Sequence, residues 1–331
     1  MQNNIIGISL GDPAGIGPEI FLKAFPKIAT IKGFLPLLIG DISVISKNLK
    51  ILDLNYKIKP IKKSVDIDEN YLNIYDTKTI LNESFPIGKD SKQCGMASFI
   101  YIKKSIQLWK QGDIEALVTL PISKKAWHLA GNFYSGHTEL LASELNASKY
   151  AMIMIAGKIR VLLITTHIPI SKVPQVLTKQ LITEKLNTSY QFLTDLGIKD
   201  PVIAVSALNP HAGEEGIMGE EEEKIIKPAI KSFQKTAKCI GPTPSDTVFK
   251  LIIENKVDLV ASMYHDQALI PLKTFFFNKL VNYTAGIPMV RTSPGHGTGF
   301  DISYSKKANP GSFIEAYKTA TYLVKGRRKK T

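Results

Sequence analysis

Short apolar segments alternate along the chain with longer segments that have the spacing of amphipathic helices. The apolar segments are 5–11, 34–40, 116–121, 151–157, 160–166, 201–208 and 258–264. Each is apolar at successive positions, which is typical of parallel strands that helices cover on both faces. Helical spacing occurs at about 17–27, 96–110, 138–145, 173–196, 219–237 and 245–255, and again at 311–324. This order predicts an α/β fold with mostly parallel sheets.

Polar motifs follow the apolar segments, whereas the segment 60–95 has only a weak pattern that we interpret as an edge hairpin. In parallel sheets, ligands bind beyond the carboxyl ends of the strands. We therefore expect the functional residues to lie in the motifs that come directly after the predicted strands.

Composition and charge narrow the class of protein. The 331 residues are 44% hydrophobic and 21% charged, which is ordinary for globular proteins. No apolar run reaches the roughly 18 residues of a membrane helix, and the first residues lack the basic region of a signal peptide. The two cysteines, Cys94 and Cys239, are far apart, which favours a reducing, cytoplasmic location. We expect no membrane association.

The net charge of +13 raises the question of nucleic acid. Lysine supplies nearly all of the basic residues, and they are scattered; the arginines are Arg160, Arg291, Arg327 and Arg328. Base readout favours arginine, whose planar fork matches guanine. The charge therefore indicates compositional bias more than nucleic-acid binding, and it makes Arg291 conspicuous.

The motif GDPAGIGPEI (11–20) follows the first predicted strand and starts a helix, with Pro18 near its beginning. It is not the GxGxxG pattern of Rossmann domains. A helix N-terminus binds anions where it is accessible, but the motif also suits a turn that is shaped only for packing.

The histidines suggest a metal site. The chain has His128, His137, His167, His211, His265 and His296. Three of them, His167, His211 and His265, follow predicted strands, and parallel strand ends meet at one edge of a sheet. Neutral imidazoles bind Zn²⁺ and Co²⁺ well, and an open position on such a site takes a substrate. Histidines whose ring nitrogens only form ordinary hydrogen bonds could occupy the same positions. Spacing alone therefore leaves open whether these three bind a metal.

A second group of residues suits an anion. His137 and Thr138 open a predicted helix after Gly136, and Arg291 offers a bidentate contact to a phosphate or carboxylate. Lys273 and Asn282 precede Arg291 in the sequence and are further candidates for contacts to an anion. Surface or capping roles are the alternative for each.

The segment SPGHGTGFDI (293–302) has closely spaced glycines, which let a ligand approach the backbone. Asp301 could accept hydrogen bonds from a ribose or cap the following turn. Asp246 could cap the next helix or face the ligand-binding cleft. The acidic run Glu220–Glu223 is interpreted as the solvated start of a helix, where negative charge is favourable.

Together these motifs resemble the 4-hydroxythreonine-4-phosphate dehydrogenase family, NAD-dependent enzymes of pyridoxal phosphate biosynthesis. The resemblance runs in order through GDPAGIGPE, VTLPISK (118–124), GHTELLA (136–142), NPHAGEEG (209–216), GPTPSDTVF (241–249), MYHDQALIPLK (263–273) and HGTGFDI (296–302). It covers nearly the whole chain, and NPHAGE and YHDQ are its most specific parts.

The resemblance implies a fold like that of isocitrate and isopropylmalate dehydrogenases, with two α/β/α domains and an active site in the cleft between them. We place the first domain at 1–127 plus 296–331 and the second at 128–295. It also implies a homodimer in which both subunits contribute to each active site.

The resemblance implies roles for individual residues, listed here by ligand. One divalent cation (Zn²⁺, Co²⁺, Mg²⁺ or Mn²⁺) would bind His167, His211 and His265, the third from the partner subunit. A phosphorylated substrate would contact His137, Thr138, Lys273, Asn282 and Arg291. NAD or NADP would lie near His296, Gly297, Thr298 and Asp301. Asp246 matches another active-site position, and Asp246 and Lys273 are the candidates for the catalytic base.

The chain departs from the family pattern in one region. Gly295 replaces a usual Asp, Gly299 replaces a usual Ala, and Ser303 begins a Ser-Tyr-Ser segment in place of Ala-Gly-Lys. All three positions flank the expected cofactor loop, so cofactor preference is where this chain is expected to differ.

The resemblance predicts oxidation of 4-phosphooxy-L-threonine at C3 to 2-amino-3-oxo-4-phosphooxybutanoate, which decarboxylates to 3-amino-2-oxopropyl phosphate. A paralogous dehydrogenase of a phosphothreonate or phosphoerythronate would share nearly all of these motifs. A non-catalytic module that binds anions or nucleic acid is a more remote alternative, for which a steep salt dependence of DNA binding would be the sign.

Overall fold

The computed structural model describes residues 4–63, 66–234 and 236–328. Its contacts divide the chain into two compact units: unit 1 comprises Met1–Ala147 and Pro288–Lys325, and unit 2 comprises Ser148–Ile287 and Gly326–Thr331. Both boundaries differ from the expected ones at 127 and 296. The difference moves His137 and Arg291, both expected in the second domain, into unit 1.

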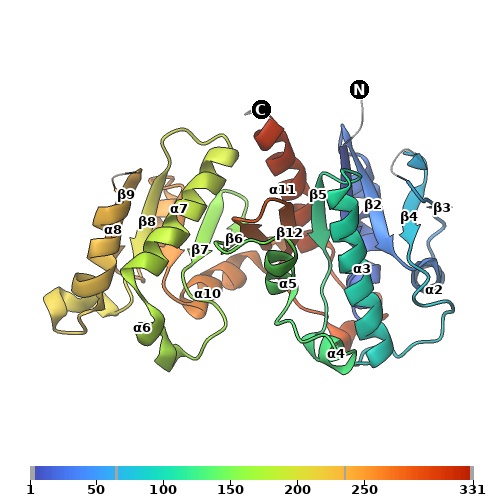
Figure 1. The fold of residues 1–331 in the computed structure, drawn as a ribbon, viewed down its shortest axis with the longest axis horizontal. Coiled ribbons are helices and arrows are strands. Elements are labelled where there is room, and N and C mark those ends of the chain that lie inside the picture. Colours follow the sequence, from blue (N-terminus) through green and yellow to red (C-terminus); the bar gives the residue numbers. More distant parts are fainter. Residues whose placement is uncertain (1–3, 64–65, 235, 329–331) are drawn as a thin grey trace. The chain divides into compact units, whose positions relative to one another are not determined.

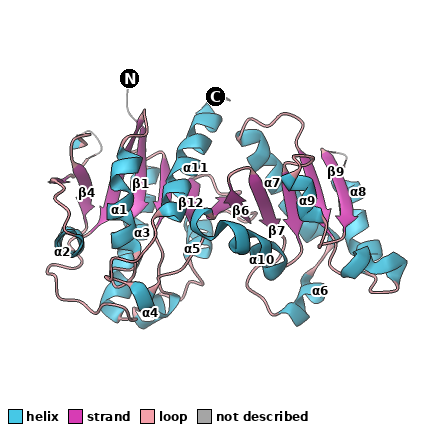
Figure 2. Cartoon of the chain, turned by 180° about the vertical axis from the view of Figure 1, so that it is seen from behind, coloured by secondary structure: helices cyan, strands magenta, loops and turns pink. Residues whose placement is uncertain are grey.

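Unit 1 contains a parallel sheet in the order β3-β4-β2-β1-β5-β12. Its strands are β1 (Asn4–Ser9), β2 (Phe34–Gly40), β3 (Ile58–Pro60), β4 (Leu72–Asp76), β5 (Ala116–Thr119) and β12 (Val290–Pro294). Its helices are α1 (Gly17–Ala29), α2 (Ile42–Leu52), α3 (Lys92–Lys110), α4 (Lys124–Leu129), α5 (His137–Glu144), the 3₁₀ turn η6 (Phe300–Ile302) and α11 (Gly311–Arg328), which extends past the unit boundary. Helix α3 covers one face of this sheet, and α1 covers the other (Figures 1 and 2).

Unit 2 contains a mixed sheet in the order β11-β6-β7-β10-β8-β9. Its strands are β6 (Ala151–Ala156), β7 (Ile159–Leu163), β8 (Val202–Ser206), β9 (Lys238–Thr243), β10 (Leu259–Ser262) and β11 (Val281–Ala285). Strand β6 is antiparallel to both of its neighbours, and the other pairs are parallel.

The helices of unit 2 lie on both faces of its sheet. They are η2 (Ile170–Lys172), α6 (Val173–Val176), α7 (Lys179–Asp195), η3 (Pro210–Gly216), the π-helix η4 (Glu222–Ile226), α8 (Lys227–Phe233), α9 (Val248–Ile253), α10 (His265–Phe276) and η5 (Phe277–Lys279). Helices α7 and α8 cover one face, and α9 and α10 pack on the other (Figures 1 and 2). The predicted α/β class with mostly parallel sheets is therefore confirmed.

Local sequence signals explain several element boundaries. Ser91, Ser123 and Thr178 cap α3, α4 and α7, each accepting a hydrogen bond from a backbone N–H of the first turn. The strand interiors are apolar and buried; Ile6, Ile8, Leu38 and Val118 have no exposed surface. None of the helices in the described ranges is long and apolar enough to cross a membrane.

The edge of the sheet in unit 1 differs from the expectation. Strands β3 and β4 pair in parallel, so the predicted hairpin in 60–95 is wrong. The predicted helix over 173–196 is divided into α6 and α7, because the chain turns to an extended conformation at Leu177 and Thr178.

Candidate active site

The guanidinium group of an arginine is buried on β12, the last strand of the unit 1 sheet. Arg291 lies on β12, and its side chain is 2% exposed. Its Nε and Nη2 atoms donate to Thr119 Oγ1 at the end of β5, at 3.1 and 2.6 Å. Burial lowers the pKa of this guanidinium to about 10, while the negative charge of Glu139 raises it. Arg291 therefore stays protonated at neutral pH and is held in one orientation.

His137 lies beside this cation at the start of α5. Its ring packs edge-on against Trp127, with 5.6 Å between centroids. Its Nε2 atom is buried and has no hydrogen-bond partner among the described residues. Burial, followed by the positive charge of Arg291, lowers the pKa of His137 well below its ordinary value. The imidazole is therefore neutral at pH 7, and its buried Nε2 forms no hydrogen bond with the part of the chain that the structure describes.

These residues form an arrangement suited to an anion. The positively charged Arg291, the polar His137 ring and the first residues of α5, including the buried Thr138, come together within unit 1. An anion at the start of α5 gains from backbone N–H groups and from the helix dipole. Arg291 adds a charge-assisted contact at low dielectric, where such contacts are strong.

The expected cofactor loop, 295–302, is anchored by the turn of the GDPAGIGPEI motif. Ile16 N donates to Thr298 O at 2.9 Å, and Tyr304 Oη donates to Pro13 O at 2.7 Å. A Cβ atom on Gly15 would lie 2.8 Å from Thr298 O, so only glycine fits there. The first residues of α1 are themselves buried. The structure thus shows the GDPAGIGPEI motif as a turn that is shaped for packing, and the segment that it packs against is the 295–302 loop.

The tip of the 295–302 loop has room for a ligand. Gly297 and Asp301 are exposed, and no atom lies within 4 Å of where a Cβ of Gly297 would be. His296 Nδ1 lies 3.1 Å from Gly297 O. An anchored backbone with an open glycine and an exposed carboxylate fits a nucleotide cofactor, whose phosphates approach the backbone and whose ribose needs an acceptor.

The departures from the family pattern have local explanations. Gly299 has a φ of 54°, where an alanine would be strained, and its Cβ would lie 3.0 Å from Ile16. Gly295 N donates to Ser312 Oγ at 2.9 Å, and Ser303 Oγ donates to Phe300 O at 3.0 Å. These contacts fix the loop on both sides.

Sequence reasoning missed Asp12, which has no exposed surface. Its Oδ1 accepts from Ala14 N at 2.9 Å, but its Oδ2 has no hydrogen-bond partner among the described residues. Burial, and more weakly the charge of Asp90, raises the pKa of Asp12 to about 6, against the lowering effect of the Ala14 hydrogen bond. A buried carboxyl of this kind is frequent at functional sites, and its place in the GDP turn was the available signal.

Unit 2 brings two of the predicted metal ligands together. His167 follows β7 and His265 begins α10 after β10, and β7 and β10 are parallel neighbours. Their rings lie with centroids 5.6 Å apart. His265 Nδ1 lies 2.7 Å from Asp266 Oδ1. A carboxylate on Nδ1 leaves Nε2 of the imidazole to face a metal.

His211 lies in the NPHAGEEG loop and carries a similar partner. Its Nδ1 lies 2.6 Å from Glu214 Oε1, and its side chain is 64% exposed. The hydrogen bond and charge of Glu214, with a smaller contribution from Asp246, raise the pKa of His211. Asp246 is exposed and precedes Thr247, the cap residue of α9, so the structure does not use it as a helix cap.

The loop around His211 has an unusual backbone. Residues 211–215 all have positive φ: His211 (51°), Ala212 (57°), Gly213 (79°), Glu214 (42°) and Glu215 (56°). A left-handed conformation costs about 1–2 kcal/mol for each residue with a side chain. Strain on this scale persists only where the surroundings hold it, and it is concentrated at functional sites.

The acidic run corrects one expectation. Glu220 and Glu223 pair with Lys224 and Lys227 on the surface, as a solvated helix start predicts. Glu222 is different, because it has no exposed surface and accepts hydrogen bonds from the chain just before His211. The prediction for Glu222 is therefore wrong.

The remaining predicted residues of unit 2 are Lys273 and Asn282. Lys273 lies on α10 and is exposed; Asn282 lies on β11, and its Oδ1 has no hydrogen-bond partner within the described ranges. No group of three or more His, Cys, Asp or Glu in the described part of this chain is close enough to hold a metal. The donor chemistry nevertheless fits a divalent cation, since His211 and His265 each have a carboxylate on Nδ1.

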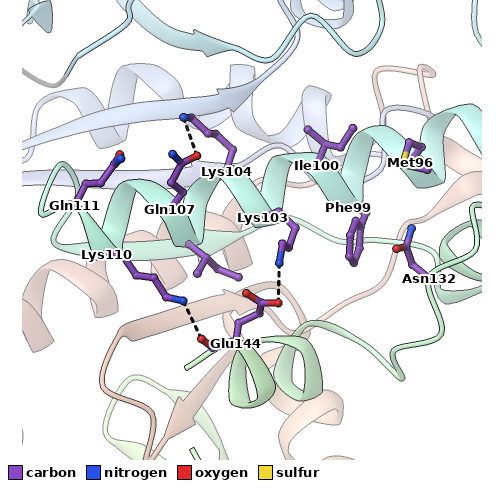
Figure 3. Close-up of a pocket in the computed structure, with 11 residues that line it drawn as sticks. Met96, Phe99, Ile100, Lys103, Lys104, Gln107, Lys110, Gln111, Asn132 and Glu144 are labelled. Carbon is purple, nitrogen blue, oxygen red and sulfur yellow. Dashed lines mark hydrogen bonds and ion pairs between the residues drawn. The ribbon is translucent and has the colours of Figure 1, made fainter. Parts of the chain in front are cut away.

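An open groove of about 660 Å³ also runs along α3 in unit 1 (Figure 3). Its cations are engaged within the groove: Lys103 pairs with Glu144 at 2.6 Å, and Lys110 Nζ donates to Glu144 O at 3.0 Å. None of the predicted site residues lines it. We therefore do not include the groove in the candidate active site.

Comparisons with known proteins show the family of this chain. The model of the family described as pyridoxal phosphate biosynthetic protein PdxA matches residues 33–320. The chain is 39% identical to a 4-hydroxythreonine-4-phosphate dehydrogenase of Sulfurihydrogenibium sp., covering 98% of this chain and 99% of that one. It is 37% identical to a D-threonate 4-phosphate dehydrogenase of Salmonella typhimurium, covering 98% and 100%. The structure of 4-hydroxythreonine-4-phosphate dehydrogenase from Klebsiella pneumoniae superposes with a TM-score of 0.88 at 35% identity, covering 98% of each chain.

Proposed function

Because the chain belongs to the family of the pyridoxal phosphate biosynthetic protein PdxA, we propose that it is a dehydrogenase of a phosphorylated hydroxy acid, with 4-phosphooxy-L-threonine as substrate. The observation that carries this proposal is the buried Arg291 beside His137 at the start of α5. Such a site holds the phosphate, and binding energy from the phosphate assists the reaction at C3.

The substrate contacts follow from the chemistry of each side chain. Arg291 and Thr138 bind the phosphate, and the neutral His137 offers its buried Nε2 as a hydrogen-bonding atom. Lys273 and Asn282 are the residues that we assign to the remainder of the substrate. Fixing the phosphate sets the register of the carbon chain, which lowers the entropic cost of reaching the reactive geometry.

We assign the metal to His167 and His211 of one protomer and to His265 of the partner subunit in a homodimer, so that the His265 beside His167 in the same chain would serve the partner's site. A divalent cation there would make the C3 hydroxyl more acidic and polarise the ketone that forms. Glu214 and Asp266 keep Nε2 of His211 and His265 available by occupying Nδ1. Imidazole ligands favour Zn²⁺ or Co²⁺ over Mg²⁺ or Mn²⁺.

We assign the nucleotide to the 295–302 loop, with His296, Gly297, Thr298 and Asp301 as its contacts. When bound there, NAD or NADP would supply the acceptor for the hydride from C3. The hydroxyl proton passes to a base, for which Asp246 and Lys273 are the candidates. The keto acid product would then lose CO₂: the C1–C2 bond breaks, its electron pair forms an enolate with the C3 ketone, and C2 takes up a proton from solvent to give 3-amino-2-oxopropyl phosphate.

The relatives named for D-threonate 4-phosphate support a second substrate at nearly the same identity. The two substrates differ at C2, where one has an amine and the other a hydroxyl. The test is the absorbance of reduced nicotinamide when the protein is mixed with NAD or NADP, Zn²⁺ or Co²⁺, and each substrate in turn. Formation of NADH with 4-phosphooxy-L-threonine, and its loss with a chelator, would support the proposal. A higher kcat/KM with D-threonate 4-phosphate would make that compound the substrate in place of 4-phosphooxy-L-threonine. No turnover with either compound would contradict the proposal that the protein is a dehydrogenase.

A further inference from the structure

We propose that Glu222 is a positioning residue that holds the loop carrying His211 in its left-handed path. This inference rests on the proposed function, because it concerns an assigned metal ligand. Glu222 does not touch His211 in the hydrogen bonds described. Glu222 contacts residues 208–209, which precede His211, and Gly213, which follows it.

The carboxylate of Glu222 binds the start of the loop. Its Oε1 accepts from Leu208 N and Asn209 N, both at 2.8 Å, and its Oε2 accepts from Asn209 Nδ2 at 2.9 Å. One buried side chain therefore receives three donors from two consecutive residues that follow β8. A buried carboxylate with this many donors is fixed in place, and so is the backbone that donates to it.

The same carboxylate also packs against the middle of the loop. A Cβ atom on Gly213 would lie 2.7 Å from Glu222 Oε2, so the loop passes directly over the carboxylate. Gly213 O accepts from Met218 N at 3.1 Å, which closes the left-handed turn. His211 lies between these two contacts, so its position and that of Glu214 follow from the position of Glu222.

The helix that presents Glu222 is itself irregular. Glu222 begins the π-helix η4, which precedes α8. A π-helical turn is uncommon and is often found at functional sites, because the wider turn redirects a side chain. Glu222 is buried while its neighbours Glu220 and Glu223 lie on the surface. The structure thus buries Glu222 against the loop, whereas the part-buried Glu221 reaches the loop through Asn209 Nδ2, at 2.8 Å.

The experiment compares Glu222→Ala and Glu222→Gln with Glu223→Gln, in which an exposed acid of the same run is neutralised. Affinity is measured for Zn²⁺ alone, by competition with a chromophoric chelator, and Co²⁺ supplies an absorption spectrum that reports the ligand geometry. Hydrogen exchange over 206–217 and the thermal unfolding midpoint are measured for each variant.

We expect Glu222→Ala to bind Zn²⁺ about 10–100-fold more weakly, in the range found for other residues that orient metal ligands. Glu222→Gln keeps an oxygen for Leu208 N and Asn209 N but opposes its amide to Asn209 Nδ2, so we expect a smaller loss, faster exchange at 208–209 and a changed Co²⁺ spectrum. Glu223→Gln should match the wild type. Should Glu222→Ala fail to fold, Glu222→Gln decides the question.

Zn²⁺ affinity within twofold of wild type in folded Glu222→Gln, together with faster exchange at 208–209, would overturn the inference while leaving the metal site in place. Unchanged exchange would overturn it as well. Failure of the wild-type protein to bind Zn²⁺ or Co²⁺ would instead count against the proposed function.

Discussion

The two units present their functional residues in opposite ways. In unit 1, Arg291 is buried and fixed by two hydrogen bonds to Thr119, and His137 is held neutral beside it. In unit 2, His211 is largely exposed, and its only described anchor is Glu214 on Nδ1. The side chains of the proposed phosphate site in unit 1 are thus held by burial and hydrogen bonds, whereas His211 and His265 of unit 2 each have a carboxylate on Nδ1, and His211 also lies on strained backbone. A phosphate site and a metal site have different requirements, and the variants below test that difference.

The largest effect is expected for His211→Ala. Losing an imidazole ligand should abolish Zn²⁺ binding, a greater loss than the ~10–100-fold typical of residues that only orient ligands. The measurement is metal content by elemental analysis after dialysis. His128→Ala is the matched control, because His128 is exposed on α4, lies with its ring tilted against that of Phe133 and has no assigned role. Near-normal metal content in His211→Ala would contradict the assignment.

A similarly direct test applies to unit 1. Arg291→Ala removes a buried charge from the proposed phosphate site, and we expect KM to rise about 100-fold, since hydrogen bonds to charged groups contribute roughly 1.5–3 kcal/mol each. Arg291→Lys keeps the charge but loses the planar fork, so its KM should lie between the two. Arg160→Ala, on β7, serves as the control. An unchanged KM in Arg291→Ala would remove Arg291 from the substrate site.

Asp12 gives the next effect, on stability rather than on binding. Its pKa of about 6 lies above its ordinary value of 3.8, so the folded state binds the proton more tightly than the unfolded state. The associated stabilisation is present below pH 4 and is lost as the pH rises through about 6. The shift corresponds to about 3 kcal/mol. The charged and titratable groups around it are Asp90, Cys94, Tyr101 and Tyr304.

Asp12→Asn cannot ionise, so its free energy of unfolding should fall less than that of the wild type between pH 4 and pH 7. Urea unfolding across this range measures the difference. Asp90→Asn should shift the transition of wild-type Asp12 to lower pH, because the Asp90 charge raises the pKa of Asp12. A constant difference between Asp12→Asn and wild type at every pH would show that Asp12 does not titrate in this window.

The sequence predicted those features that depend on strand order and on rare residue types. The ends of β7 and β10 carry His167 and His265 because parallel neighbours end at the same edge, and those rings do meet. Arg291 was conspicuous as one of four arginines in a lysine-rich chain. The α/β class follows from apolar segments that are buried on both faces.

The features that were missed depend on tertiary burial. Strand β12 has the sequence VRTSP and is buried throughout, so its polar residues hid it from an apolar pattern. Such conflicts between local pattern and burial are expected at functional sites. Glu222 sits in a run of four acids whose members look alike in sequence, and only the packing of η4 under the 208–213 loop distinguishes it.

The smallest effect sharpens the comparison at a single hydrogen bond. Glu214→Gln leaves the His211 ring in place but weakens the hydrogen bond on its Nδ1 and removes the charge of the partner, which in that order raise the pKa of His211. Protons and metal compete for an imidazole, so a raised pKa makes wild-type metal uptake fall at a higher pH than that of an ordinary histidine. The variant should therefore shift the midpoint of Co²⁺ uptake to lower pH, while at pH 8 it binds about tenfold more weakly because the carboxylate no longer strengthens the ligand. Glu215→Gln, one residue further along the same left-handed segment, is the matched control. An identical uptake curve for Glu214→Gln and wild type would mean that His211 keeps its orientation from the backbone alone, and the contrast between the two units would then rest on Glu222 and the left-handed path rather than on a carboxylate–histidine pair.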